Sequence, residues 1–86
     1  MADAATASKT LTNSYQEIIT GACMLSLEEG LAIRLVFDSS LPSDNAASHL
    51  LNNDNSPLSY TGGLKVYARI DEKAFGTVTK VSYTGV

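Results

Sequence analysis

The sequence predicts an all-β domain, a small antiparallel β-sandwich or a barrel-like relative, with an N-terminal arm. Apolar and polar side chains alternate over residues 64–70, which is typical of a half-buried strand. Similar segments recur along the chain, and residues that favour turns separate them. The 86 residues suffice for one small domain, which we place at 10–86, and the small polar residues 1–9 form the arm.

The first half of the domain is expected to contain three strands. Residues 10–20 form the first strand, with imperfect alternation, and residues 23–27 form the second. A hairpin-like turn at 28–30 follows, in which Gly30 can adopt a positive φ. Residues 31–37 are the most apolar segment, which predicts a strand at the centre of the sheet.

The second half is richer in turn-forming residues. Residues 48–51 predict a short strand or a turn of helix, and the other strands are expected at 58–60, 64–70 and 76–84. Polar connections are expected at 38–47, 52–57 and 71–75, where Ser, Asp, Asn and Pro favour turns.

Strand 64–70 would present Lys65, Tyr67 and Arg69 on its outer face, because its apolar residues occupy the alternate positions. Tyr and Arg are enriched at protein interfaces, so this row indicates a contact surface for another protein. An ordinary solvated surface and a platform for a sugar are the alternatives.

Composition argues against several classes of function. The net charge is −3 and the six basic residues are scattered, which disfavours nucleic-acid binding. No apolar run approaches the length of a membrane span, and the N-terminus lacks the pattern of a secretory signal. We therefore expect a protein made in the cytoplasm and kept or assembled there. Cys23 is the only cysteine and lies among apolar residues, which predicts a buried structural thiol.

The sequence offers no set of residues for catalysis or for a cofactor. Glu28 and Glu29 are adjacent, as are Asp71 and Glu72, so the members of each pair would point to opposite faces of a strand. His49 is the only histidine, and no nucleophile motif accompanies it. The Asp- and Asn-rich loops lack the spacing of an EF-hand. We expect neither an enzyme nor a metal site.

A sugar-binding module is the second functional hypothesis. Its best candidate platform is Tyr60 beside the carboxamides of Asn52, Asn53 and Asn55, because an aromatic ring and amides together suit a saccharide.

A resemblance to a known class of protein rests on several short segments. They are Ile33-Arg34-Leu35-Val36-Phe37, Ser40-Leu41-Pro42, Asn45-Ala46-Ala47, His49-Leu50-Leu51, Leu58-Ser59-Tyr60-Thr61-Gly62 and Val66-Tyr67-Ala68-Arg69. Together they resemble small virion proteins of tailed bacteriophages, over residues 10–84. The resemblance implies a structural head decoration (cement) protein on the capsid surface. Such proteins bridge neighbouring subunits of the major capsid protein, often as homotrimers at local three-fold axes.

From this resemblance we expect contacts with the major capsid protein or with sister subunits at three places. The arm would dock by strand addition, the loop at 41–49 would touch a neighbour, and the outer row of strand 64–70 would complete the interface. The residues concerned are Ala2, Asp3, Thr6, Lys9, Leu41, Pro42, His49, Lys65, Tyr67 and Arg69. A carbohydrate- or receptor-binding module of a tail fibre or spike, and a low-copy tail or connector component, are the alternatives.

Overall fold

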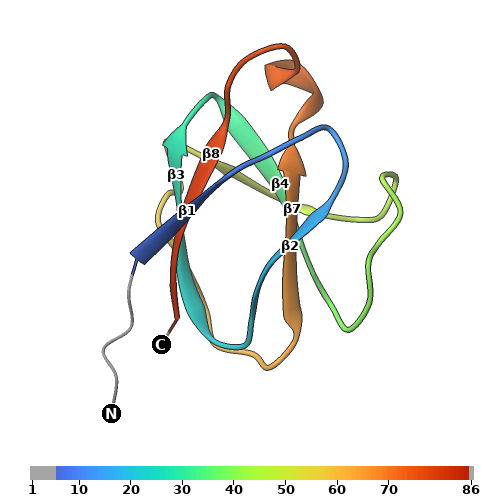
Figure 1. Ribbon diagram of the computed structural model, residues 1–86, viewed down its shortest axis with the longest axis vertical. Coiled ribbons are helices and arrows are strands. Elements are labelled where there is room, and N and C mark those ends of the chain that lie inside the picture. Colours follow the sequence, from blue (N-terminus) through green and yellow to red (C-terminus); the bar gives the residue numbers. More distant parts are fainter. Residues whose placement is uncertain (1–5, 86) are drawn as a thin grey trace.

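The computed structural model describes residues 6–85, which fold into two four-stranded antiparallel sheets packed face to face (Figure 1). The strands are β1 (Thr6–Thr10), β2 (Gln16–Thr20), β3 (Cys23–Glu29), β4 (Ala32–Asp38), β5 (His49–Asn52), β6 (Leu58–Tyr60), β7 (Lys65–Ile70) and β8 (Lys80–Gly85). A 3-10 helix, η1 (Glu72–Ala74), lies between β7 and β8. The predicted small all-β sandwich is confirmed.

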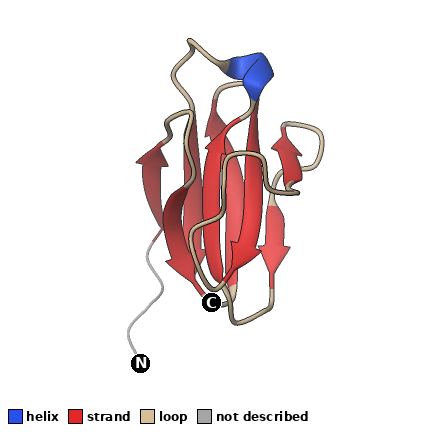
Figure 2. Cartoon of the chain, turned by 90° about the vertical axis from the view of Figure 1, so that its right-hand side faces the viewer, coloured by secondary structure: helices blue, strands red, loops and turns tan. Residues whose placement is uncertain are grey.

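The chain passes repeatedly from one sheet to the other. The strand orders are β1-β8-β3-β6 and β2-β7-β4-β5, so within residues 6–85 only β4 and β5 are both consecutive and paired. Figure 2 shows the two layers, with η1 at one end. The turn at Gly30, predicted to be hairpin-like, instead carries the chain between the sheets, although its φ of +108° is positive as expected.

Alternating side chains from both sheets fill the space between them. Six large aliphatic residues are fully or almost fully buried there: Leu25, Ile33, Leu35, Leu51, Val66 and Val81. Each lies on a strand where every second residue faces inward, as the period of two requires. Cys23 is buried in this core, and burial raises the pKa of its thiol. The predicted buried thiol is therefore confirmed.

The predicted arm is wrong over residues 6–9, because they belong to a strand of the domain. The register of β1 against β8 runs from Thr6 opposite Thr84 to Thr10 opposite Lys80. A threonine-rich segment suits an extended backbone, and its pairing satisfies backbone groups of β8 that would otherwise form a sheet edge. The rest of the arm, residues 1–5 with Ala2 and Asp3, lies outside the described residues.

The strand predicted at 10–20 is two strands in different sheets. The chain turns at residues 12–14, where the Ser14 backbone N–H donates to Thr12 Oγ1 at 3.4 Å. The backbone N–H of Thr12 in turn donates to Gln16 Oε1 at 3.1 Å. Such local side-chain bonds compete with a continuous strand, which is why alternation alone misplaced the boundary.

Candidate functional site

The outer row predicted on β7 is wrong for two of its three residues. Tyr67 is 3% exposed and Arg69 is 7% exposed. Lys65 is only partly buried, and its Nζ lies 3.7 Å from Glu17 Oε1. The positions of the side chains do alternate as predicted, since Tyr67 pairs with Val36 on the face away from the main core. That face is therefore covered instead of being open to solvent.

A second, smaller apolar cluster explains the cover. Tyr15, Val36 and Tyr67 pack together, with Ala46 of the β4–β5 loop against them. The loop thus lies over the outer face of the β2-β7-β4-β5 sheet. One sequence signal pointed to this arrangement: Val36 places an apolar side chain on a face that alternation assigned to solvent.

Arg69 is the buried charged residue at the edge of this cluster. Its Nη1 donates to the carbonyl of Ile70 at 2.9 Å, and its Cζ lies 5.4 Å from the centroid of the Tyr15 ring. Its Nη2 is 3.7 Å from Glu72 Oε1, which is longer than a hydrogen bond. Within the described residues its buried Nε has no hydrogen-bond partner. The guanidinium is thus held in place while part of its donor capacity is unused.

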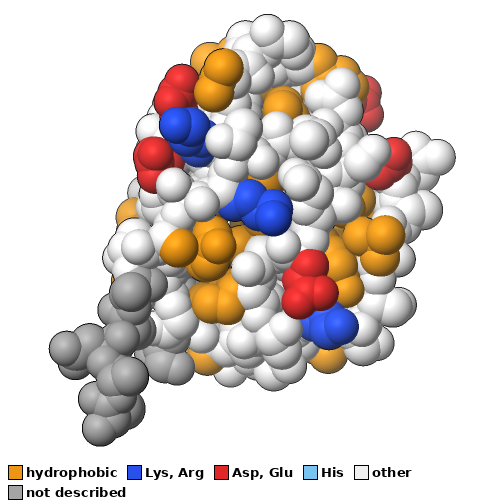
Figure 3. All heavy atoms as spheres, in the orientation of Figure 1, with side chains coloured by type: hydrophobic (Ala, Val, Ile, Leu, Met, Phe, Trp, Pro, Cys, Tyr) orange, Lys and Arg blue, Asp and Glu red, His pale blue; other side chains and the backbone are white. Residues whose placement is uncertain are grey.

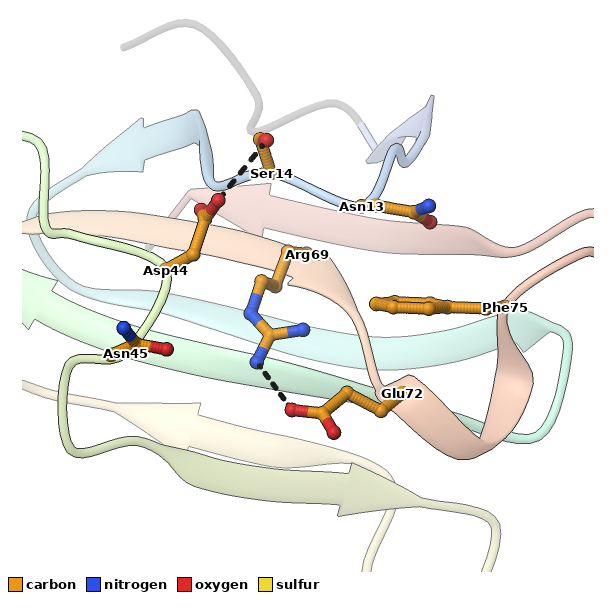
Figure 4. A pocket seen from close by; sticks show the side chains of 7 residues that line it. All are labelled: Asn13, Ser14, Asp44, Asn45, Arg69, Glu72 and Phe75. Atoms are coloured by element: carbon orange, nitrogen blue, oxygen red, sulfur yellow. Dashed lines mark hydrogen bonds and ion pairs between the residues drawn. The ribbon is translucent and has the colours of Figure 1, made fainter.

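A shallow hollow of about 410 Å³ opens at this arginine (Figure 4). Its lining comes from the β1–β2 loop, the β4–β5 loop, β7 and the η1 region: Asn13, Ser14, Asp44, Asn45, Arg69, Glu72 and Phe75. A smaller hollow of about 240 Å³ adjoins it, shares four of these residues and adds Arg34, Ala46 and Ser48. Sequence reasoning had singled out Arg69 as a site residue and had included Asp44, Asn45, Ala46 and Ser48 only as members of the contact loop at 41–49.

An ion pair fixes the wall beside the hollows. Arg34 Nε donates to Asp71 Oδ1 at 2.6 Å, and the Lys73 backbone N–H donates to Asp71 Oδ2 at 3.1 Å. Burial on its own would raise the pKa of Asp71, but these bonds and the charges of Arg34 and Lys73 outweigh it and hold the pKa below its ordinary value. Asp71 is therefore a structural anion that caps η1.

Three predicted contact residues lie at or near the surface in and beside the β4–β5 loop: Leu41, Pro42 and His49. Leu41 is 65% exposed, and Pro42 beside it is partly buried. His49 begins β5, is exposed, and has its ring 5.7 Å from that of Phe37. These residues belong to neither hollow. Among the residues that the structure describes, Leu41, Pro42 and His49 therefore do not share a hollow with Arg69.

The groups of the sugar platform predicted at Tyr60 have partners within the fold. The Tyr60 ring stacks on Phe37 with 4.2 Å between centroids, and its hydroxyl accepts from the backbone N–H of Leu64 at 3.0 Å. Asn55 Nδ2 donates to the Leu50 carbonyl at 2.7 Å, and Asn52 Oδ1 accepts from the backbone of Asp54 at 2.9 Å. These groups hold the turn together, which is the usual task of Asn in such loops.

Three exposed apolar residues lie at the end of the sandwich that carries η1. Leu31, Phe75 and Val78 are 61%, 42% and 57% exposed, and we call them the apolar end. The β3–β4 turn and the η1–β8 loop meet there, since a Cβ on Gly30 would stand 2.6 Å from Thr79 Oγ1. In Figure 3 a few separate hydrophobic side chains are visible near the upper end, and others lie lower on the same face. Clustered exposed apolar groups are typical of contact surfaces.

The described part of the chain has neither a cluster of metal-ligating side chains nor a membrane-spanning helix. Across residues 6–85, no three His, Cys, Asp or Glu side chains lie close enough together to hold a metal ion. Nor does that part of the chain contain a helix with the length and apolar character needed to cross a bilayer.

The comparisons with known proteins returned no relative: the chain matches no family model, no curated protein and no solved structure.

Proposed function

We propose that this chain is a structural virion protein that decorates and stabilises a bacteriophage capsid by bridging neighbouring subunits of the major capsid protein. The small sandwich fold and the resemblance to tailed-phage virion proteins support this role. Two segments that carry the resemblance, 33–37 and 66–69, lie side by side on β4 and β7, with Leu35 opposite Ala68. They form the middle of one sheet and belong to the scaffold, so contacts with the capsid have to come from other surfaces.

The observation that carries the proposal is the apolar end. Leu31 and Val78 sit on connections between strands and are more than half exposed. Apolar side chains at such positions gain nothing for the fold, but they stabilise a complex once a partner removes them from water, at about 25 cal/mol per Å² buried. In this proposal the capsid subunit is the partner that covers them.

Bridging requires a second contact surface, and two features of the structure are available for it. The exposed Leu41 lies on the β4–β5 loop, and β1 is an edge strand whose only partner within residues 6–85 is β8. An unpaired strand edge can accept a strand from a neighbouring subunit. Self-association, as a homotrimer in the arrangement that the resemblance implies, would use this edge.

Particle binding by variants of the apolar end tests the proposal. We expect the double variant Leu31→Ser with Val78→Ser to bind depleted phage particles more weakly than the parent chain, with an unchanged urea midpoint. Leu64→Ser is the matched control, because Leu64 is 45% exposed and its backbone pairs with Gly21 at the other end of the sandwich. Equal occupancy by all three proteins would contradict the role of the apolar end.

A further inference from the structure

The hollow beside Arg69 has the construction of a ligand site. Arg69 contributes a guanidinium whose side chain is only 8% exposed, yet it is not saturated with hydrogen bonds. Its Nε is fully buried and cannot reach a ligand, but its Nη2 lies 3.7 Å from Glu72 Oε1, beyond hydrogen-bond distance, so this nitrogen keeps donor capacity for a partner in the hollow. The Tyr15 ring lies under this guanidinium, and its buried hydroxyl also has no hydrogen-bond partner in residues 6–85, although Tyr15 lines neither hollow.

The charges around the hollow favour a neutral ligand. The two adjoining hollows are lined by two cationic residues, Arg34 and Arg69, and by two anionic residues, Asp44 and Glu72, so their lining carries no net formal charge. A phosphate or a carboxylate would gain from the arginines and lose against the carboxylates. A neutral ligand avoids this repulsion.

The hydrogen-bonding groups favour hydroxyls on that ligand. Arg69 can only donate, while the carboxylates of Asp44 and Glu72 can only accept; the carboxamides of Asn13 and Asn45 can do both. A hydroxyl placed beside the 3.7 Å separation between Arg69 Nη2 and Glu72 Oε1 would accept from the first and donate to the second. Several such hydroxyls on one rigid ring match this mixture of donors and acceptors.

Phe75 adds an apolar surface to the same hollow. Its ring is 42% exposed and stands beside the Arg69 guanidinium in Figure 4. The C–H face of a sugar ring is apolar and packs against an aromatic ring, while the sugar hydroxyls point outward to polar groups. The volume of about 410 Å³ lies at the small end of ligand sites, which are roughly 300–1,000 Å³.

We propose that this hollow binds a neutral saccharide of one or two rings, with Phe75 beneath the sugar, Arg69 and Glu72 sharing a hydroxyl, and Asn45 completing the contacts. The proposal goes beyond the role on the capsid and does not depend on it, because it concerns the isolated protein. Because Phe75 also belongs to the apolar end, the site is the one offered by the free protein, before a capsid subunit covers that end.

The test is a titration of the ¹⁵N-labelled full chain with maltose, lactose and N,N′-diacetylchitobiose, each up to about 50 mM, a range that covers weak binding. We expect at least one of them to cause saturable amide shifts at Asn13, Asp44, Asn45, Glu72 and Phe75. Asn45→Ala and Phe75→Ala should each weaken binding about tenfold. Their matched controls, Asn53→Ala in the β5–β6 turn and Leu64→Ala at the far end, should bind as the parent does.

Glucuronate and inorganic phosphate are the comparison probes. Tighter binding of either at the same amides would overturn the proposal in favour of an anion site. The proposal would also be overturned if none of the three neutral sugars gave saturable shifts, or if the shifting amides lay outside the hollow. Equal loss of sugar affinity in the control variants and the site variants would overturn it as well. Asn45 and Phe75 are both exposed, so their substitution leaves the core intact and a loss of binding reports on the site.

Discussion

Arg34 on β4 and Asp71 at the start of η1 form a short ion pair, with 2.6 Å between Nε and Oδ1. The Asp71 side chain is 4% exposed and Arg34 is 35% exposed, so the pair lies at the boundary between core and solvent. It joins the end of β7 to the neighbouring strand and holds the η1 wall of the hollow.

We expect Asp71→Asn to lower the free energy of unfolding by about 1–3 kcal/mol near neutral pH, because a charge-assisted bond to Arg34 is lost and the cap of η1 is weakened. The pKa of Asp71 is lowered in the folded protein, so its contribution is present above the ordinary pKa of about 3.9 and disappears as the pH falls through the lowered value. Urea unfolding across this acidic range should show the gap between parent and variant closing.

The exposed aspartate Asp54, in the β5–β6 turn, provides the control, since Asp54→Asn should change stability by less than about 0.5 kcal/mol. A gap between parent and Asp71→Asn that stayed constant down to strong acid would show that the charge of Asp71 is not what stabilises the fold.

Gly30 is required by both backbone and packing. Its φ is +108°, and an added Cβ would lie 2.6 Å from Thr79 Oγ1, which is itself fully buried. Gly21 has a similar φ of +91° but open space around it. We expect Gly21→Ala to cost about 1 kcal/mol and Gly30→Ala roughly 2 kcal/mol more, in urea unfolding of the two variants. Equal costs would mean that the contact with Thr79 relaxes freely.

A substitution at Tyr67 distinguishes the covered face seen in the structure from the solvated face that alternation alone predicts. If Tyr67 is buried beneath Tyr15 and Ala46, Tyr67→Ala should cost about 3 kcal/mol in urea unfolding. On a solvated face the same change would cost less than about 0.5 kcal/mol. Lys65→Ala, two residues away on the same face, should have only that small effect, because its ion pair with Glu17 is exposed.

Two N-terminal truncations separate the arm from the strand that follows it. Removing residues 2–9 deletes most of β1, so β8 loses its partner and we expect a lower Tm. Removing residues 2–5 keeps β1 and deletes Ala2 and Asp3, and we expect it to weaken particle binding alone. Circular dichroism melts and co-sedimentation with particles give the two readouts. Full particle binding by the shorter truncation would remove these residues from the interface.

Local patterns were sufficient to predict the fold class and most strands. Period-two alternation located β3, β4 and β7 within one or two residues, because each has its inner side chains in the main core. Strand order could not be predicted from local patterns. Within residues 6–85, β4 and β5 are the only strands that are both consecutive and paired, so every other pairing joins strands that are distant in the sequence. Such non-local pairing depends on how turns aim the chain between sheets.

The candidate site was largely missed for the same reason. Asn13, Asp44 and Phe75 are far apart in the chain and meet only because loops from different parts of it converge over β7. Turn-forming Asn and Asp residues look alike whether they hold a turn, as Asn52 does, or line a hollow, as Asn45 does. Alternation placed Arg69 on the correct face of β7, but it could not show that the β4–β5 loop covers this face.

The most direct test of the proposed function is the amount of this protein in purified particles of the phage to which the proposal assigns it, measured by quantitative peptide mass spectrometry against the major capsid protein. A decoration protein occupies equivalent positions on a symmetric shell, so we expect a high, fixed ratio to the shell subunit. A few copies per particle would instead indicate a tail or connector component, and absence from the particle would contradict the virion role altogether.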